Sequence, residues 1–309
     1  MEGRIRFVTP FETALYLKRV EPLRDLAPEY LAVVAQQAQE RFFTRGSIIF
    51  RPGVAVGSFH IVVDGRLRVR GAEHGDAVLG PDETLGFLSL LARWPDGLDA
   101  IADADTRTLE IDSDDLDEVF EDHFAILHNE MRTMASRTLR QRMDTPTGRY
   151  FAPAEGRLTV PERELDFMDR LHYLQGSPVF KRANIDVMIA FASRTPEVRF
   201  DAGATLWRPG DPSGFLYALV AGRVRCNLPD GRWFLCGPGY PLGNIESQCG
   251  APRWYEAVTE TPVVALRAAT DVFLDVLEDH FEMARGVLSV MATGLISILV
   301  EQREGAGVR

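Results

Sequence analysis

The chain has 309 residues, of which 46% are hydrophobic and 26% are charged, a composition typical of a folded protein with room for two ordinary domains. Its formal net charge of -11 would repel a phosphate backbone, and no block of Lys and Arg offsets it, so we expect no nucleic-acid partner. The three cysteines, Cys226, Cys236 and Cys249, lack the paired spacing of a zinc site, which indicates reduced thiols.

Neither end of the chain predicts a membrane segment. Residues 1–20 carry charges throughout and lack the continuous apolar run of a secretory signal. The most apolar stretch, residues 287–300, contains polar residues and falls short of the roughly 20 residues of a spanning helix. We therefore expect a cytoplasmic protein with no membrane span and no cofactor.

An internal repeat organises the chain. The segment Gly46-Ser-Ile-Ile-Phe-Arg-Pro-Gly53 recurs 157 residues later as Gly203-Ala-Thr-Leu-Trp-Arg-Pro-Gly210. The same shift relates Gly65-Arg66 to Gly222-Arg223, Leu85-Gly86 to Leu242-Gly243, and the Glu-Asp-His-Phe segments that end at Phe124 and Phe281. Several matches in one register indicate a duplicated unit.

In chain order, each copy begins with a helix and continues with short strands. Residues 30–40 and 185–194 have apolar residues at helical spacing. Phe59, Ile61 and Val63 then alternate with other residues before Asp64-Gly65, a dipeptide that suits a tight hairpin. Glycines bracket strand-length segments, as expected for many short strands joined by turns in a barrel or jelly roll.

A long helix ends each copy. Residues 113–142 and 270–303 have apolar residues at steps of three and four, with Ser113 and Thr270 available as caps. The repeated Glu-Asp-His-Phe segment is expected to kink or cap this helix, because adjacent helical residues point about 100° apart and do not converge on a metal ion. Residues 144–160 are rich in Pro, Gly and Thr and are predicted to be a linker.

These elements predict an α+β fold, mainly β, with two tandem β-roll or jelly-roll domains flanked by N- and C-terminal helices. The predicted domains are residues 1–143 and 161–309. With its repeated Gly-x-x-Ile/Leu-x-x-x-Gly element and the later Gly243-Asn244 step, the chain resembles the cyclic-nucleotide-binding domain family.

The resemblance implies where a ligand would bind. In this family the cyclic phosphate sits at the start of a short helix, where free N–H groups and the helix dipole favour an anion. A downstream arginine pairs with the phosphate, and a glutamate that opens the short helix accepts from the ribose 2′-hydroxyl.

The second copy keeps part of this cassette. The resemblance assigns its ligand-binding residues to six positions: Gly243, Asn244, Ile245, Arg253, Trp254 and Tyr255. Arg253 is the candidate phosphate ligand, Asn244 replaces the glutamate, and Trp254 could stack on a base. An alternative for Arg253 is a surface ion pair with Glu246 or Glu256.

The first copy departs further from the pattern. Gly86 is kept, but Phe87 stands at the glutamate position. Counting back from Thr106 puts Leu98 at the arginine position, and the 157-residue shift puts Asp96 there; neither can hold a phosphate. Arg93 is the one nearby substitute, so we expect a degenerate site.

Two functions follow from the sequence. The first is a non-enzymatic sensor that binds cyclic AMP or a related nucleotide in its second domain and signals through the C-terminal helix. The second is a degenerate β-roll scaffold that binds another protein. No catalytic motif is present, and no helix-turn-helix is expected. The apolar stripe of the last helix, which includes Leu288 and Leu295, favours a homodimer or packing within the chain equally, and Gly294 would permit a close approach.

Overall fold

The computed structural model describes residues 9–21, 23–144, 162–175, 180 and 184–306. Its contacts divide the chain into two compact units, which are residues 1–130 with 291–309, and residues 131–290. This division does not follow the predicted boundaries at 143 and 161, because the long helix after each β-roll contributes its last part to the other unit. Those boundaries follow the sequence repeat and stay a prediction; most of the linker lies outside the described residues.

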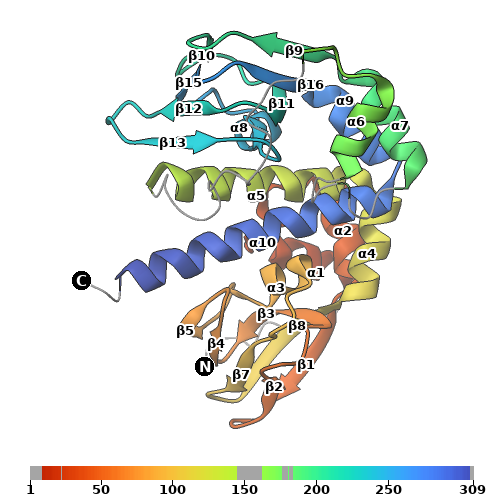
Figure 1. Ribbon diagram of the computed structural model, residues 1–309. Coiled ribbons are helices and arrows are strands. Elements are labelled where there is room, and N and C mark those ends of the chain that lie inside the picture. Colours follow the sequence, from red (N-terminus) through yellow and green to blue (C-terminus); the bar gives the residue numbers. More distant parts are fainter. Residues whose placement is uncertain (1–8, 22, 145–161, 176–179, 181–183, 307–309) are drawn as a thin grey trace. The chain divides into compact units, whose positions relative to one another are not determined.

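The first unit contains a β-roll made of two four-stranded antiparallel sheets (Figure 1). One sheet has the order β1 (Gln39–Phe43), β8 (Thr106–Asp112), β3 (Ser58–Asp64), β6 (Thr84–Leu85). The other has the order β2 (Ile48–Phe50), β7 (Asp99–Ala102), β4 (Leu67–Gly71), β5 (Gly75–Leu79). The inward side chains of these strands, such as Phe59, Ile61 and Leu67, are buried.

Helices precede, interrupt and follow these strands. Their bounds are α1 (Pro10–Leu17), a 3-10 turn (Leu23–Asp25), α2 (Pro28–Gln37), α3 (Phe87–Ala92), α4 (Ser113–Asp122) and α5 (Phe124–Asp144). Helix α1 begins at Thr9 with a reciprocal capping box: the Thr9 hydroxyl accepts from the Glu12 amide, and the Glu12 carboxylate accepts from the Thr9 amide. The helix predicted at residues 30–40 is α2, which begins two residues earlier, at Pro28.

The second unit repeats the same order. Its sheets are β9 (Glu197–Phe200), β16 (Val263–Ala269), β11 (Phe215–Ala221), β14 (Pro241–Leu242), and β10 (Thr205–Trp207), β15 (Glu256–Thr259), β12 (Val224–Asn227), β13 (Trp233–Cys236). Its helices are α6 (Phe167–Gln175), α7 (Ile185–Arg194), α8 (Asn244–Cys249), α9 (Thr270–Glu278) and α10 (Phe281–Ala306). The predicted α+β class with two tandem β-rolls is confirmed, although helices hold more of the described residues than strands do.

The turn at Asp64-Gly65 is not the predicted hairpin. Strand β3 pairs with β6 and β8, whereas β4 pairs with β5 and β7, so this turn carries the chain from one sheet to the other. Gly65 has a φ of 96°, and a Cβ there would lie 2.5 Å from the Asp105 carbonyl oxygen. The turn therefore needs glycine because of close packing between the sheets.

Each trailing helix is broken, as the repeated Glu-Asp-His-Phe segment predicts. Helix α4 ends at Asp122 and α5 begins at Phe124, while α9 ends at Glu278 and α10 begins at Phe281. The predicted caps are wrong by one residue. Asp112 caps α4 through its own carboxylate, and Ala269 precedes α9 without a side-chain cap.

Helix α10 is longer than the apolar stretch on which the membrane prediction rested. Residues Phe281–Glu304 form a helix long and apolar enough to cross a membrane by length and composition, so the expectation of a stretch too short was wrong. Of its most apolar 18-residue stretch, 56% is buried inside the protein, as in the core helix of a folded domain.

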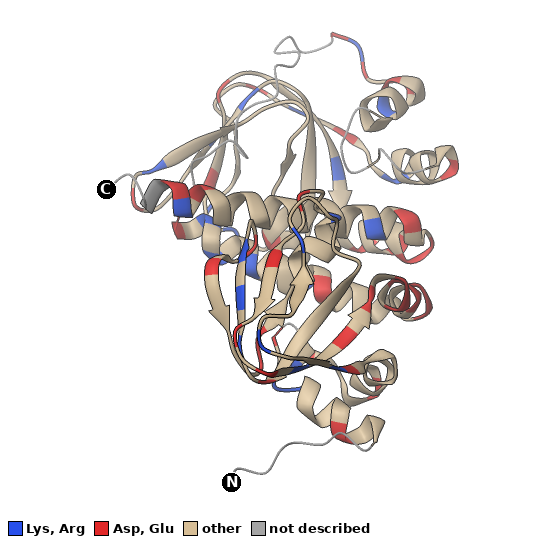
Figure 2. Cartoon of the chain, turned by 90° about the horizontal axis from the view of Figure 1, so that it is seen from below, with Lys and Arg blue, Asp and Glu red and all other residues tan. Residues whose placement is uncertain are grey.

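Basic and acidic residues are interspersed along the described helices and strands (Figure 2).

Candidate functional site

The candidate site of the second β-roll is built around the start of α8. Gly243 precedes the helix with a φ of 81°, in the left-handed region. A Cβ at this position would lie 2.3 Å from Nη1 of Arg253 and 3.0 Å from the Trp207 ring. Glycine is required here for its φ and because a guanidinium group lies directly against the backbone.

Arg253 directs its hydrogen bonds into the protein. Its Nη1 donates to the Gly243 carbonyl oxygen at 2.9 Å and to Oε1 of Glu246 at 3.1 Å, and its Nη2 donates to the Phe215 carbonyl oxygen. The guanidinium carbon also lies 4.0 Å from the centre of the Trp207 ring, in cation-π geometry. These contacts engage Nη1 and Nη2, whereas Nε is buried and has no hydrogen-bond partner among the described residues.

The pair of Arg253 with Glu246 is fully desolvated. The two side chains are 0% and 2% exposed. Burial raises the pKa of Glu246, and the adjacent Arg253 charge opposes that rise. The alternative pairing with Glu246 predicted from the sequence is confirmed, but the pair lies in the interior and not on the surface.

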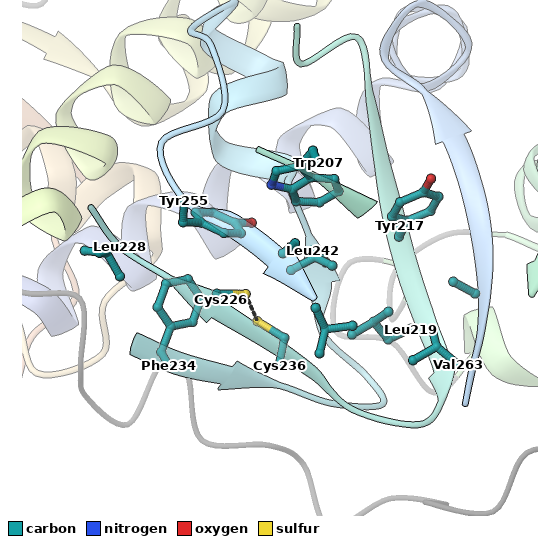
Figure 3. Packing of buried hydrophobic residues seen from close by; sticks show 13 residues of the cluster. Trp207, Tyr217, Leu219, Cys226, Leu228, Phe234, Cys236, Leu242, Tyr255 and Val263 are labelled. Atoms are coloured by element: carbon teal, nitrogen blue, oxygen red, sulfur yellow. Dashed lines mark hydrogen bonds between the residues drawn. The ribbon is translucent and has the colours of Figure 1, made fainter. Parts of the chain in front are cut away.

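Aromatic side chains form much of the buried hydrophobic cluster of this β-roll (Figure 3). Trp207 stacks on Tyr217 with ring centres 5.9 Å apart, and Tyr255 lies 5.7 Å from Trp207. Trp254 stacks on Phe234 at 5.8 Å. Trp207, Tyr217, Tyr255 and Phe234 are buried in one hydrophobic cluster, against which the half-buried Trp254 packs. Trp254, the residue predicted to stack on a base, thus stacks on Phe234 in this structure.

The cysteines of this β-roll are free thiols. Cys226 and Cys236 lie in the same cluster, with sulfur atoms 3.9 Å apart, and Cys249 is half-buried at the end of α8. Burial raises the pKa of Cys226 well above its usual value. A protonated, buried thiol is a poor nucleophile, so Cys226 contributes packing.

In the first β-roll, the corresponding glycine, Gly86, lies against hydrocarbon side chains. Gly86 has a φ of 85° and precedes α3. A Cβ there would lie 3.1 Å from the Phe50 ring, 3.2 Å from Val56 and 3.6 Å from Leu98. Phe87 is buried and lies edge-on to Phe59 at 4.9 Å. The degenerate character of this cassette stays a prediction.

The profile of the cyclic nucleotide-binding domain matches the chain twice, at residues 40–123 and 197–280, which together make up more than half of its length. The chain belongs to the cyclic nucleotide-binding domain family. The two matched segments coincide with the two β-rolls and their cassette helices, α3 and α8.

A relative of known identity matches part of the chain. A CRP-like cAMP-activated global transcriptional regulator of Mycobacterium tuberculosis is 28% identical over 122 residues, which are 38% of this chain and 54% of the regulator. The chain thus spans about half the length of the curated relatives it matches.

Two solved structures cover nearly the whole chain. The regulatory subunit of a cAMP-independent protein kinase A from Trypanosoma brucei is 15% identical, with a TM-score of 0.32, and the match covers 96% of this chain and 89% of that one. The regulatory domain of Toxoplasma gondii protein kinase A, crystallised with cAMP, is 15% identical, with a TM-score of 0.35 and coverage of 94% and 99%.

Backbone hydrogen bonds decide which residue of the first copy corresponds to Arg253. The Gly210 amide donates to the Arg253 carbonyl oxygen at 2.8 Å, and the Gly53 amide donates to that of Asp96 at 2.7 Å. Asp96, not Leu98, therefore corresponds to Arg253, so counting back from Thr106 gave the wrong residue. Arg93 does not replace it, because its exposed guanidinium lies 3.5 Å from Asp117.

Sequence reasoning missed Glu73. This buried carboxylate, from the turn between β4 and β5, accepts from the Leu88 amide at 3.1 Å, the Ser89 amide at 2.9 Å and the Ser89 hydroxyl at 2.9 Å. Ser89 and Glu246 occupy equivalent positions in the two cassette helices. The chain thus supplies its own carboxylate at the cassette of each β-roll, by two different routes.

His60 is buried inside the first β-roll. Its Nδ1 lies 3.1 Å from the Thr108 hydroxyl. Nε2 lies 3.7 Å from Oε1 of Glu110, and burial lowers the pKa of His60 to about 4.

Proposed function

We propose that this chain is a non-enzymatic regulatory adaptor of the cyclic nucleotide-binding domain family, whose β-rolls hold their folded form without a nucleotide and act by binding another protein. The observation that carries this proposal is the buried pair of Arg253 with Glu246, which engages the one arginine at the family's phosphate position.

The energetics of the pair support the proposal. A cyclic phosphate would have to take Arg253 from Glu246 and leave a carboxylate buried without its partner. Breaking one side of a buried ion pair costs about 3–5 kcal/mol. Since 1.4 kcal/mol is a factor of ten in affinity, such a cost lowers nucleotide affinity by roughly a hundredfold to several thousandfold.

The ribose contact also differs from the family pattern. Asn244, which begins α8, replaces the glutamate expected to accept from the 2′-hydroxyl, and a neutral amide makes a weaker contact than a carboxylate. The aromatic residues beside Arg253 would in addition have to move. Trp207 lies against the guanidinium group, and Tyr255 lies against Trp207.

A second candidate is the sensor in which cyclic AMP binds the second β-roll and the signal passes through α10. It is favoured by the guanidinium group of Arg253, which lies against Gly243 at the start of α8. The Mycobacterium tuberculosis relative is described as cAMP-activated. In this case the phosphate would replace the Glu246 carboxylate on Arg253.

Thermal shift measurements separate the two candidates. The wild type, Arg253→Ala and the control Arg225→Ala are melted with and without 1 mM cyclic AMP, cyclic GMP and cyclic dinucleotides. Arg225 belongs to the same β-roll, but its guanidinium lies over the Trp233 ring. The adaptor predicts no nucleotide-dependent shift in any variant, whereas the sensor predicts stabilisation of the wild type and the control only.

A further inference from the structure

The turn between β4 and β5 is held from two sides, and both contacts lie within the first compact unit. Strand β4 ends at Gly71 and β5 begins at Gly75, and these two residues pair. The turn between them is Ala72, Glu73 and His74. We name residues 71–75 the hairpin latch. One of its contacts is with α3, and the other is with the last turns of α10.

The contact with α3 is made by a buried charge. Glu73 accepts hydrogen bonds from two main-chain amides of the first turn of α3 and from the Ser89 hydroxyl. First-turn amides have no partner within their own helix, and a carboxylate satisfies them with charge-assisted bonds. His74 adds a second polar group, with Nε2 3.5 Å from Oε1 of Glu73.

The contact with α10 is made by Arg303. Its Nη2 donates to the carbonyl oxygen of Ala72, the residue directly before Glu73. Gly75 has a φ of 68°, and a Cβ there would lie 2.9 Å from Nη1 and 3.1 Å from Cδ of Arg303. The glycine therefore permits the arginine to lie against the turn.

Gly71 serves the same purpose on the other side. A Cβ at Gly71 would lie 2.4 Å from Cδ2 of Leu98, the buried residue that also packs against Gly86 at the start of α3. The latch thus begins and ends with a glycine that permits a close contact. Gly71 permits the contact with the interior of the β-roll, and Gly75 permits the contact with α10.

We propose that the hairpin latch couples the cassette helix α3 to the C-terminal turns of α10, so that displacing either one releases the other. A partner that pulls the end of α10 from the latch breaks the hydrogen bond to the Ala72 carbonyl and weakens the contact of Glu73 with α3. In the other direction, loss of the Glu73 contact weakens the binding of Arg303 to the turn. Coupling of this kind is reciprocal. The inference goes beyond the proposed adaptor function and does not depend on whether a nucleotide binds.

Hydrogen exchange of the full chain tests the coupling. Amide exchange is followed by mass spectrometry in peptides covering residues 86–92 and 296–304, in the wild type, Glu73→Gln and Arg303→Met. We expect Arg303→Met to accelerate exchange in residues 86–92, and Glu73→Gln to accelerate it in residues 296–304, each by about fivefold or more.

Two variants are matched controls. Glu83→Gln removes a carboxylate that accepts from the Gly80 amide in the neighbouring turn, and Arg232→Met removes an arginine that donates to the main-chain carbonyls of Met143 and Asp144 in the other unit. Neither control should change exchange in the two peptides. The coupling would be overturned if Glu73→Gln accelerated exchange only in residues 86–92 and Arg303→Met accelerated it only in residues 296–304. If Glu73→Gln does not fold, the Arg303 variant alone decides.

Discussion

Arg253 is the residue on which the proposed function rests, and its ion pair with Glu246 can be measured through the free energy of unfolding. Arg253→Met leaves Glu246 buried without a partner and should lower the free energy of unfolding by about 3–5 kcal/mol. Arg253→Met with Glu246→Leu replaces both charges by hydrocarbon and should recover most of this loss. Urea denaturation of the two single variants and the double variant measures the coupling, and additive losses would contradict a tight pair.

His60 makes stability depend on pH in a defined direction. Because its pKa is about 4 in the folded protein and about 6.5 unfolded, the unfolded chain binds a proton first as pH falls. The stabilising effect of the neutral ring is present above pH 6.5 and is lost as pH falls toward 4.

The measurement compares urea denaturation of the wild type and His60→Gln at several pH values. The wild type should lose about 3 kcal/mol more than the variant between pH 7 and pH 4. Parallel pH profiles for the two proteins would show that the buried imidazole does not govern this dependence.

At the scale of elements, the turn glycines differ in what they permit. Gly222 has a φ of 87°, and a Cβ there would lie 2.1 Å from the Pro262 carbonyl oxygen, whereas Gly210 has a φ of 92° and open space around it. Gly210→Ala should cost about 1 kcal/mol, from backbone strain alone. Gly222→Ala should cost several times more, as measured by denaturation, and equal losses would remove the role assigned to close packing between the sheets.

The repeat in the sequence predicts most elements but not how they pair. Each strand of the first β-roll has its counterpart 157 residues later, and the cassette helices begin directly after Gly86 and Gly243. The Asp64-Gly65 hairpin was wrong because a turn dipeptide looks the same whether its strands pair or lie in two different sheets.

The site was predictable only in part for a related reason. Glu246 stands near Arg253 in the sequence, but nothing in the residue types reveals that both are buried. Glu73 reaches α3 across 15 residues of chain, and its counterpart in the second copy, Asp230, pairs locally with Arg232 instead. A contact made in one copy alone leaves no trace in the repeat.

At the scale of the whole molecule, the apolar stripe of α10 is used inside the chain. Val287, Leu288, Leu295 and Ile298 are buried, and so is Gly294, the residue expected to allow close approach in a homodimer. We therefore predict a monomer of 34.5 kDa by light scattering across a concentration series. A stable particle of twice this mass would support the homodimer through the C-terminal helix instead.

In the proposed function, the chain's own carboxylates occupy both cassettes, and titration calorimetry of the wild type with cyclic AMP and cyclic GMP tests this occupancy. We predict no saturable heat with either nucleotide at concentrations up to about 1 mM, the regime of weak affinity near -4 kcal/mol. Saturable binding of one nucleotide per chain at about 10 μM or tighter, lost in Arg253→Ala, would contradict this occupancy and identify the second β-roll as a working nucleotide sensor.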